Sequence, residues 1–269
     1  MNRIQNKFTQ LSELKEKALV GFITAGDPDM DRSLAFATAM CRAGLDVLEL
    51  GVPFSDPTAD GPVIQRAATR SLAAGTTLAD VIGLASRIRR ETAVPIILFS
   101  YYNPVFRYGL EAFYRDAAAA GVDGLLVVDL PPEESDEMTS LWHGADFDLI
   151  RLVAPTTPEA RMARIAASAS GFLYLVSMTG VTGSDGLDVP AIARQADRLR
   201  ALSDIPVCVG FGISTPDEVA AVGAVADGVV IGSAFERMIE ENIDSPDLPA
   251  MLAEMVRQYK AATREKQSL

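Results

Sequence analysis

Two carboxylates that could transfer protons lie close together near the end of a predicted strand. Glu49 lies between Leu48 and Leu50 in the strand expected over 46–51, and Asp60 lies in the loop that follows it. Burial at a strand end disfavours the charged form of a carboxyl group, which raises its pKa and suits it to proton transfer near neutrality. Two carboxylates in different environments can divide acid and base roles. The pattern therefore indicates acid–base chemistry centred on Glu49, with Asp60 in support.

Each carboxylate also has a purely structural interpretation. A glutamate at a strand end can pair with a neighbouring Arg or Lys. Asp60 precedes Gly61-Pro62 and a predicted helix, where an aspartate commonly serves as the N-cap. Asp56, in the same loop, is typical of a turn.

Glycines after two later strands indicate an anion site. The strand over 206–210 ends in Gly210-Phe211-Gly212, and the strand over 228–231 is followed by Gly232-Ser233 at a helix start. Glycine lets the backbone approach an anion closely, and a helix N-terminus supplies free N–H groups. In barrels, the loops after strands seven and eight and a short extra helix form a recurrent phosphate site. Ordinary turn glycines are the alternative.

Further candidates follow the other predicted strands. The loop 177–186 contains three glycines and small polar residues, which is typical of a lid, although a surface loop without function has the same composition. Tyr174 is expected in the core or the pocket wall. Asp129 could line a pocket or anchor a loop, and Phe22 and Tyr101 could line the pocket.

The elements that must position these residues repeat along the whole chain. Eight short apolar runs alternate with helical stretches, and several runs are apolar almost throughout, as parallel strands covered on both faces are. The predicted strands are 18–24, 46–51, 95–101, 124–129, 149–153, 172–177, 206–210 and 228–231. Because no linker divides these units, we predict one domain over residues 1–269, an α/β fold of the single (β/α)8 TIM-barrel type.

Extra helices depart from the plain repeat. An amphipathic helix is expected over 4–16, where it could plug the bottom of the barrel, and others over 62–74, after strand two, and 234–242, after strand eight. Helix boundaries are also marked. Gly44 and Gly121 fit the position after a helix end, and Thr157-Pro158 and Thr215-Pro216 fit an N-cap followed by proline.

Composition restricts the class of protein. The 269 residues carry a formal net charge of -12, which disfavours nucleic acid as a partner. Cys41, Cys208 and the single histidine, His143, provide neither a disulfide framework nor a metal-ligand spacing. The N-terminus has no signal-peptide pattern, and the run 165–184 is too rich in Gly, Ser and Thr to cross a membrane. We therefore expect a soluble cytoplasmic protein with no metal and no membrane partner.

The segment LELGVPFSDPTADGPVIQ, with GFITAGDP before it and YYNPVF, GVTG, VGFGIS and IGSA after it, resembles the α subunit family of tryptophan synthase. The resemblance covers essentially the whole chain. It implies a carbon–carbon lyase of tryptophan biosynthesis that cleaves indole-3-glycerol phosphate to indole and glyceraldehyde 3-phosphate by a retro-aldol reaction. It implies no cofactor in this chain.

Carried over by motif, the resemblance makes Glu49 the general acid/base that protonates the indole carbon bearing the side chain, and Asp60 the partner of the indole N–H. A proton then leaves the C3′ hydroxyl as the C–C bond breaks, with Glu49 as its candidate acceptor. The implied substrate-binding residues are Phe22, Tyr101, Leu126, Tyr174, Thr182, Gly183, Gly210, Phe211, Gly212, Gly232 and Ser233.

The resemblance also implies a partner. The family works as an α2β2 heterotetramer whose β subunit carries pyridoxal phosphate and receives the indole through a tunnel. Asp56 and the YYNP loop match positions near that partner. Thr58 and Met178-Thr179 depart from the family pattern in loops that serve partner coupling and lid closure.

Three alternatives remain at this point. Another phosphate-binding barrel of histidine or tryptophan biosynthesis would typically use paired aspartates or a catalytic lysine. No lysine occurs between Lys17 and Lys260, which excludes lysine chemistry at most strand ends. A catalytically weak subunit that activates its partner, and a free-standing lyase that releases indole, would use the same loops.

Overall fold

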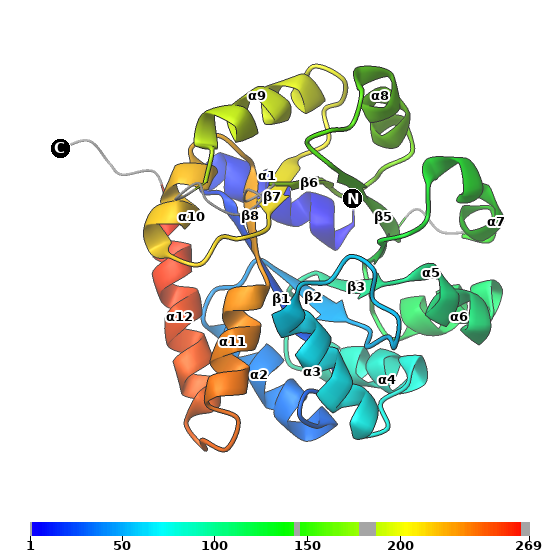
Figure 1. Cartoon of the computed structure of the whole chain (residues 1–269), viewed down its shortest axis with the longest axis vertical. Coiled ribbons are helices and arrows are strands. Elements are labelled where there is room, and N and C mark those ends of the chain that lie inside the picture. Colours follow the sequence, from blue (N-terminus) through cyan, green and yellow to red (C-terminus); the bar gives the residue numbers. More distant parts are fainter. Residues whose placement is uncertain (1, 143–145, 178–186, 265–269) are drawn as a thin grey trace.

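The computed structural model describes residues 2–142, 146–177 and 187–264. Its centre is a closed barrel of parallel strands in sequence order, β1 to β8 (Figure 1). The strands are β1 (Ala18–Thr24), β2 (Val47–Gly51), β3 (Ile96–Ser100), β4 (Gly124–Val127), β5 (Asp148–Val153), β6 (Leu173–Val176), β7 (Val207–Gly210) and β8 (Gly228–Ile231). The predicted TIM barrel is confirmed.

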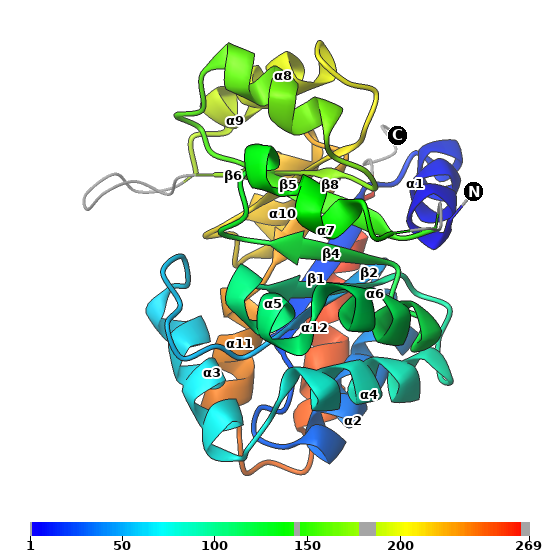
Figure 2. The same ribbon diagram turned by 90° about the vertical axis from the view of Figure 1, so that its right-hand side faces the viewer.

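Helices surround the strands (Figures 1 and 2). They are α1 (Arg3–Leu14), α2 (Met30–Arg42), α3 (Pro62–Ala73), α4 (Leu78–Arg89), α5 (Tyr102–Tyr108), α6 (Leu110–Ala119), the 3-10 helix η1 (Pro132–Glu134), α7 (Asp136–Thr139), α8 (Glu159–Ala167), α9 (Val189–Arg200), α10 (Pro216–Gly223), α11 (Ser233–Glu241) and α12 (Leu248–Ala262). The extra helices predicted before β1, after β2 and after β8 are confirmed as α1, α3 and α11.

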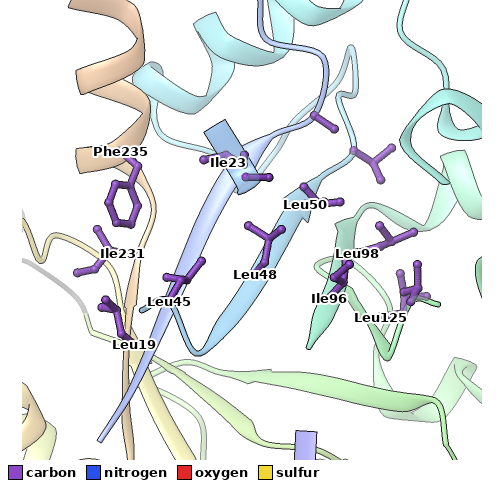
Figure 3. Packing of buried hydrophobic residues seen from close by; sticks show 14 of the residues in the cluster. Leu19, Ile23, Leu45, Leu48, Leu50, Ile96, Leu98, Leu125, Ile231 and Phe235 are labelled. Carbon is purple, nitrogen blue, oxygen red and sulfur yellow. The ribbon is translucent and has the colours of Figure 1, made fainter. Parts of the chain in front are cut away.

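Strand alternation divides the core into two layers. Leu48 and Leu50 belong to the apolar layer between the strands and the helices (Figure 3). Val47, on the opposite face of β2, belongs to the barrel interior, which it shares with residues of other strands such as Leu126 and Tyr174. Because successive strand residues point to opposite faces, Glu49 faces the interior with Val47.

Helix α1 closes one end of the barrel, as predicted. Its buried residues Ile4, Phe8 and Leu11 belong to the interior cluster. The ring of Phe8 lies 5.8 Å from the ring of Phe172 at the start of β6. The site must therefore lie at the other end, where the strands finish and where barrel enzymes build their active sites.

Most of the predicted helix boundaries hold. Gly44 and Gly121 follow α2 and α6 with φ of 110° and 82°, values that favour glycine. Thr215 caps α10 in a capping box with Glu218.

Two local predictions are wrong. Thr157 is not the N-cap of α8, because Pro158 holds that position and the Thr157 hydroxyl accepts a hydrogen bond from the N–H of Ala154. The segment YYNP is not a loop, because it begins α5. At the start of α5, the carboxylate of Asp129 accepts a hydrogen bond from the N–H of Tyr102, the first helical residue. Asp129 thus anchors the loop after β4 to α5.

None of the helices in the described ranges is long and apolar enough to cross a membrane. In the same ranges, no group of three or more His, Cys, Asp and Glu side chains is placed to hold a metal ion.

Candidate active site

Glu49 lies inside the barrel with almost no solvent contact. It is 1% exposed, and among the described residues its Oε1 atom has no hydrogen-bond partner. Burial raises the pKa of the Glu49 carboxyl to about 8. The alternative interpretation, an ion pair with a neighbouring Arg or Lys, is not borne out among the described residues, and the protonated acid is favoured at neutral pH.

Two further buried groups lie near Glu49. The charge of Glu49 contributes to raising the pKa of Tyr174 and of Cys208 well above their usual values, although burial is the larger cause for both. The hydroxyl of Tyr174 occupies the space beside Gly210 that a larger residue would fill. Tyr174 thus lies in the buried interior of the barrel beside Gly210, and its phenol stays protonated.

Asp60 occupies a different environment. It lies half-buried in the loop between β2 and α3. Burial raises its pKa, and a hydrogen bond with Tyr101 opposes that rise. The N-cap of α3 is Gly61 and not Asp60, so the structural interpretation of Asp60 as a cap is wrong. Its carboxylate, hydrogen-bonded to Tyr101, does not cap the helix.

Tyr101 holds the loop that carries Asp60. Its hydroxyl oxygen accepts a hydrogen bond of 3.0 Å from the N–H of Ala59. Its ring lies 5.2 Å from that of Phe54, which follows the same strand as Glu49. Burial is the largest cause that raises the Tyr101 pKa to about 12, so the hydroxyl remains a donor.

Phe22 lies between Glu49 and Gly232. It pairs in register with Glu49 between β1 and β2, and its ring packs edge-on against Phe99 at 5.2 Å. Gly51 leaves room for this ring, since a side chain there would collide with it. On the other side, the nearest atom to a Cβ placed on Gly232 is Phe22 Cβ, at 3.6 Å.

The ends of β7 and β8 carry the glycines for which the sequence predicts an anion site. Phe211 and Gly212 have φ of 99° and 74°, and Phe211 is 46% exposed. Gly232 is the N-cap of α11 and Ser233 its first residue, so the free N–H groups of this nine-residue helix point out of the barrel end. A Cβ at position 232 would contact no atom closer than 3.6 Å, so packing does not require glycine there and the space beside it could admit a ligand.

The structure thus brings together the predicted residues Glu49, Phe22, Tyr174, Gly210 and Gly232. Leu126 is fully buried in the interior layer. Thr182, Gly183 and Met178-Thr179 lie outside the described residues.

Three contributors were not predicted from the sequence. Gly51 makes room for Phe22, and the Ser177 hydroxyl donates to the carbonyls of Gly210 and Phe211 at 3.0 and 2.8 Å. Arg70 binds Asp27 behind the site. The only signal in the sequence was the place of Ser177 at the start of the loop 177–186. The partners of all three residues are distant in the chain, so their contacts could not be predicted.

A closed parallel barrel whose strands enclose a buried carboxyl without a charged partner among the described residues is typical of a (β/α)8-barrel enzyme. Residues 8–264 match the family model described as tryptophan synthase alpha chain. The chain belongs to the tryptophan synthase alpha chain family.

Individual relatives agree with this assignment. The chain is 64% identical to the tryptophan synthase alpha chain of Desulfosudis oleivorans over 98% of this chain and 100% of that protein. It is 61% identical to that of Desulfatibacillum aliphaticivorans, with the same coverage. Among solved structures, tryptophan synthase subunit alpha from Legionella pneumophila str. Paris has a TM-score of 0.90 at 38% identity and 98% coverage of both chains.

Proposed function

We propose that this chain is a carbon–carbon lyase that cleaves indole-3-glycerol phosphate to indole and D-glyceraldehyde 3-phosphate. Membership of the tryptophan synthase alpha chain family supports the reaction. The observation in the structure that supports it best is the carboxyl of Glu49, which is buried without a charged partner and has a pKa raised to about 8. Such a group holds a proton at neutral pH and can deliver it to carbon.

Glu49 acts twice in this proposal. Its acid form protonates the indole carbon that bears the glycerol phosphate side chain, which makes the ring an electron acceptor. The carboxylate so formed then takes the proton of the C3′ hydroxyl while the C–C bond breaks. The bonding electrons return to the ring and the C3′ oxygen becomes the aldehyde, so Glu49 ends in the protonated state in which it began.

Asp60 stabilises the charged intermediate. Protonation at carbon places positive charge on the indole nitrogen, and a carboxylate that accepts a hydrogen bond from this N–H lowers the energy of that state. The hydrogen bond with Tyr101 opposes the rise in the pKa of Asp60 that burial causes, which favours the ionised form this role needs.

The remaining groups hold the substrate. In the proposal, the N–H groups at Gly232 and Ser233 and the backbone of Gly212 bind the phosphate. The residues that enclose the indole and the glycerol are Phe22, Tyr101, Leu126, Tyr174, Gly210 and Phe211. Thr182 and Gly183 are proposed to complete this site on the basis of the family motif.

Family membership implies a β partner. We infer an α2β2 complex in which the partner holds pyridoxal phosphate, with no cofactor, nucleic acid or membrane bound by this chain. We also infer that residues 1–269 form one domain and that the protein works in the cytoplasm, where its buried thiols Cys41 and Cys208 stay reduced.

Indole release from indole-3-glycerol phosphate by the purified chain tests the proposal. We expect slow release by the chain alone and strong acceleration when a tryptophan synthase β subunit is added. Fast release without the partner would identify a free-standing lyase, and acceleration of the partner without cleavage would identify an activating subunit. Absence of release under both conditions, with the Glu49→Gln variant as background, would contradict the proposed reaction.

A further inference from the structure

Two separate elements hold the two ends of the substrate in the proposed function. The loop that carries Asp60 leads into α3, and the phosphate end lies at the start of α11, which follows β8. Figures 1 and 2 both show these two helices side by side on the outside of the barrel. Whatever joins α3 to α11 therefore sets the separation between the indole and phosphate ends of the site.

Helix α3 is attached directly to Asp60. The side chain of Gln65, in the first turn of α3, donates a hydrogen bond of 2.8 Å to the backbone carbonyl of Asp60. The N–H of Gln65 also binds the carbonyl of Gly61 at 3.0 Å. A shift of α3 along its axis would therefore carry Asp60 with it.

A row of charged groups joins α3 to α11. Glu240, in the last turns of α11, accepts two hydrogen bonds of 2.7 Å from Arg66 and one of 2.8 Å from Arg70. Arg70 also binds both carboxylate oxygens of Asp27, at 2.8 and 2.7 Å. The Asp27 side chain is fully buried and lies in the segment between β1 and α2.

Arg70 therefore spans three elements with one planar group. A guanidinium presents its donors in a rigid fork, so a bidentate pair fixes orientation as well as distance. Hydrogen bonds from Arg66 and Arg70 lower the pKa of the Glu240 carboxyl to about 2. The ion pairs between α3 and α11 therefore stay charged at any physiological pH.

Two more hydrogen bonds close the arrangement. The Ser71 hydroxyl in α3 donates to the carbonyl of Ala25 at 2.6 Å. Glu236, one turn into α11 and fully buried, accepts a hydrogen bond from the N–H of Thr24 at the end of β1. Both helices are thus attached to the end of β1 as well as to each other.

We propose that Arg70 and Glu240 are positioning residues that set the separation between the indole and phosphate ends of the active site. Neither is placed to touch the reacting atoms. The inference rests on the proposed function, because that function assigns the two ends of the substrate to these two elements.

A comparison of joined and separate ligands tests the inference. The probes are indole, glycerol 3-phosphate and 3-(indol-3-yl)propyl phosphate, in which a chain that cannot be cleaved joins the two ends. In Glu240→Gln, which leaves the Arg70–Asp27 pair in place, we expect the joined ligand to bind about tenfold more weakly or worse, while each separate ligand changes by less than about twofold. Separate ligands can each adopt the local optimum, whereas a joined ligand needs both sites at the right separation.

Arg42→Met is the matched control. Arg42 forms an ion pair with Glu91, its side chain is 68% exposed, and both residues lie outside α3 and α11. We expect this variant to change the affinity of all three ligands by less than about twofold, as exposed ion pairs generally contribute little. Arg66→Met removes two hydrogen bonds of the α3–α11 link and should weaken the joined ligand in the same direction as Glu240→Gln. Arg70→Lys keeps a charge but cannot bind both carboxylates through a planar fork, so its loss for the joined ligand should resemble that of Glu240→Gln.

Thermal unfolding of each variant establishes that it is folded before binding is measured. If Glu240→Gln bound the joined ligand as tightly as the unaltered chain, or lost the separate ligands to the same degree, the positioning role would be wrong. If the unaltered chain bound none of the three ligands, the proposed function itself would fail, so the two failures are distinguishable.

Discussion

Buried carboxylates lie at both ends of the barrel, and their surroundings differ. At the end where the strands begin, Asp123 is bound by Arg3 at 2.7 Å and Arg89 at 2.6 Å, and Asp46 is bound by Lys260 at 2.8 Å. Asp148, in the same region, accepts a hydrogen bond of 2.7 Å from Asn2. At the other end, Glu49 is as deeply buried, yet its Oε1 atom has no partner among the described residues.

This difference distinguishes the carboxylates that stabilise the fold from the carboxyl that could transfer a proton. A buried carboxylate with cationic partners stays charged and links the elements it joins, and removing one partner is costly. A buried carboxyl without such partners is held in the neutral form, which contributes nothing comparable to stability but leaves a proton available for transfer. Glu49 and the paired carboxylates at the opposite end should therefore respond in opposite ways to the loss of the carboxylate.

The largest effect is expected for Glu49→Gln. The amide keeps the shape but transfers no proton, so we expect kcat for indole release to fall by roughly 10²–10⁴-fold. Affinity for glycerol 3-phosphate should be unchanged. Near-full activity would show that Glu49 is not the acid/base group.

The same variant gives a pH test of the buried carboxyl. Because the pKa of Glu49 rises from 4.5 to about 8 on folding, the neutral acid contributes stability that is fully present below pH 4.5 and is lost as pH rises through about 8. The melting temperature of Glu49→Gln should therefore match that of the unaltered chain in acid and exceed it above neutrality. If the melting temperatures of the two proteins changed with pH in parallel, the Glu49 carboxyl would not be held in its neutral form.

Asp123→Asn should have the next largest effect, on stability. It leaves the half-buried Arg89 guanidinium without a carboxylate, so we expect a loss of roughly 3–5 kcal/mol in the free energy of unfolding. The kcat of the folded fraction should be unchanged. A denaturant titration measures the first quantity and an assay at low temperature the second, and a large fall in kcat would mean that the two ends are not independent.

Asp60→Asn should have a smaller effect than Glu49→Gln and act on catalysis. Loss of the charge opposite the indole N–H should raise the barrier in kcat/KM by roughly 2–4 kcal/mol. Stability should change little, because Asp60 does not cap α3. Unchanged kcat/KM would mean that Asp60 has only a structural role, in the turn before α3.

The smallest effect is expected at two glycines of the same strand–helix unit. A Cβ on Gly232 meets nothing closer than 3.6 Å, whereas one on Gly228 would lie 2.6 Å from the Cys208 sulfur. Gly232→Val should therefore raise KM by about tenfold with little loss of stability, because it fills space left for the phosphate. Gly228→Ala, the control at the other end of β8, should lower the melting temperature and leave KM unchanged. If Gly232→Val instead lowered the melting temperature and left KM unchanged, the phosphate would not bind at Gly232.

Prediction from the sequence succeeded where the signal was local. The apolar runs predicted the eight strands, and Thr215 followed by Pro216 marked the start of α10. It failed at Thr157, whose hydroxyl binds the N–H of Ala154 in place of the helix end, and in YYNP, where a helix begins. In both cases the local pattern fits two structures: Thr-Pro fits a turn or a helix N-cap, and a segment after a strand fits a loop or a helix start.

The sequence alone established the barrel and the positions of its strand ends, because the period of apolar residues depends only on neighbours along the chain. It could not establish which buried carboxylates are paired. Asp27 lies 43 residues from Arg70, and Glu240 lies 170 residues from it. Only closure of the barrel brings these charges together while leaving Glu49 alone, because burial and charge partners depend on distances in space that residue order does not contain.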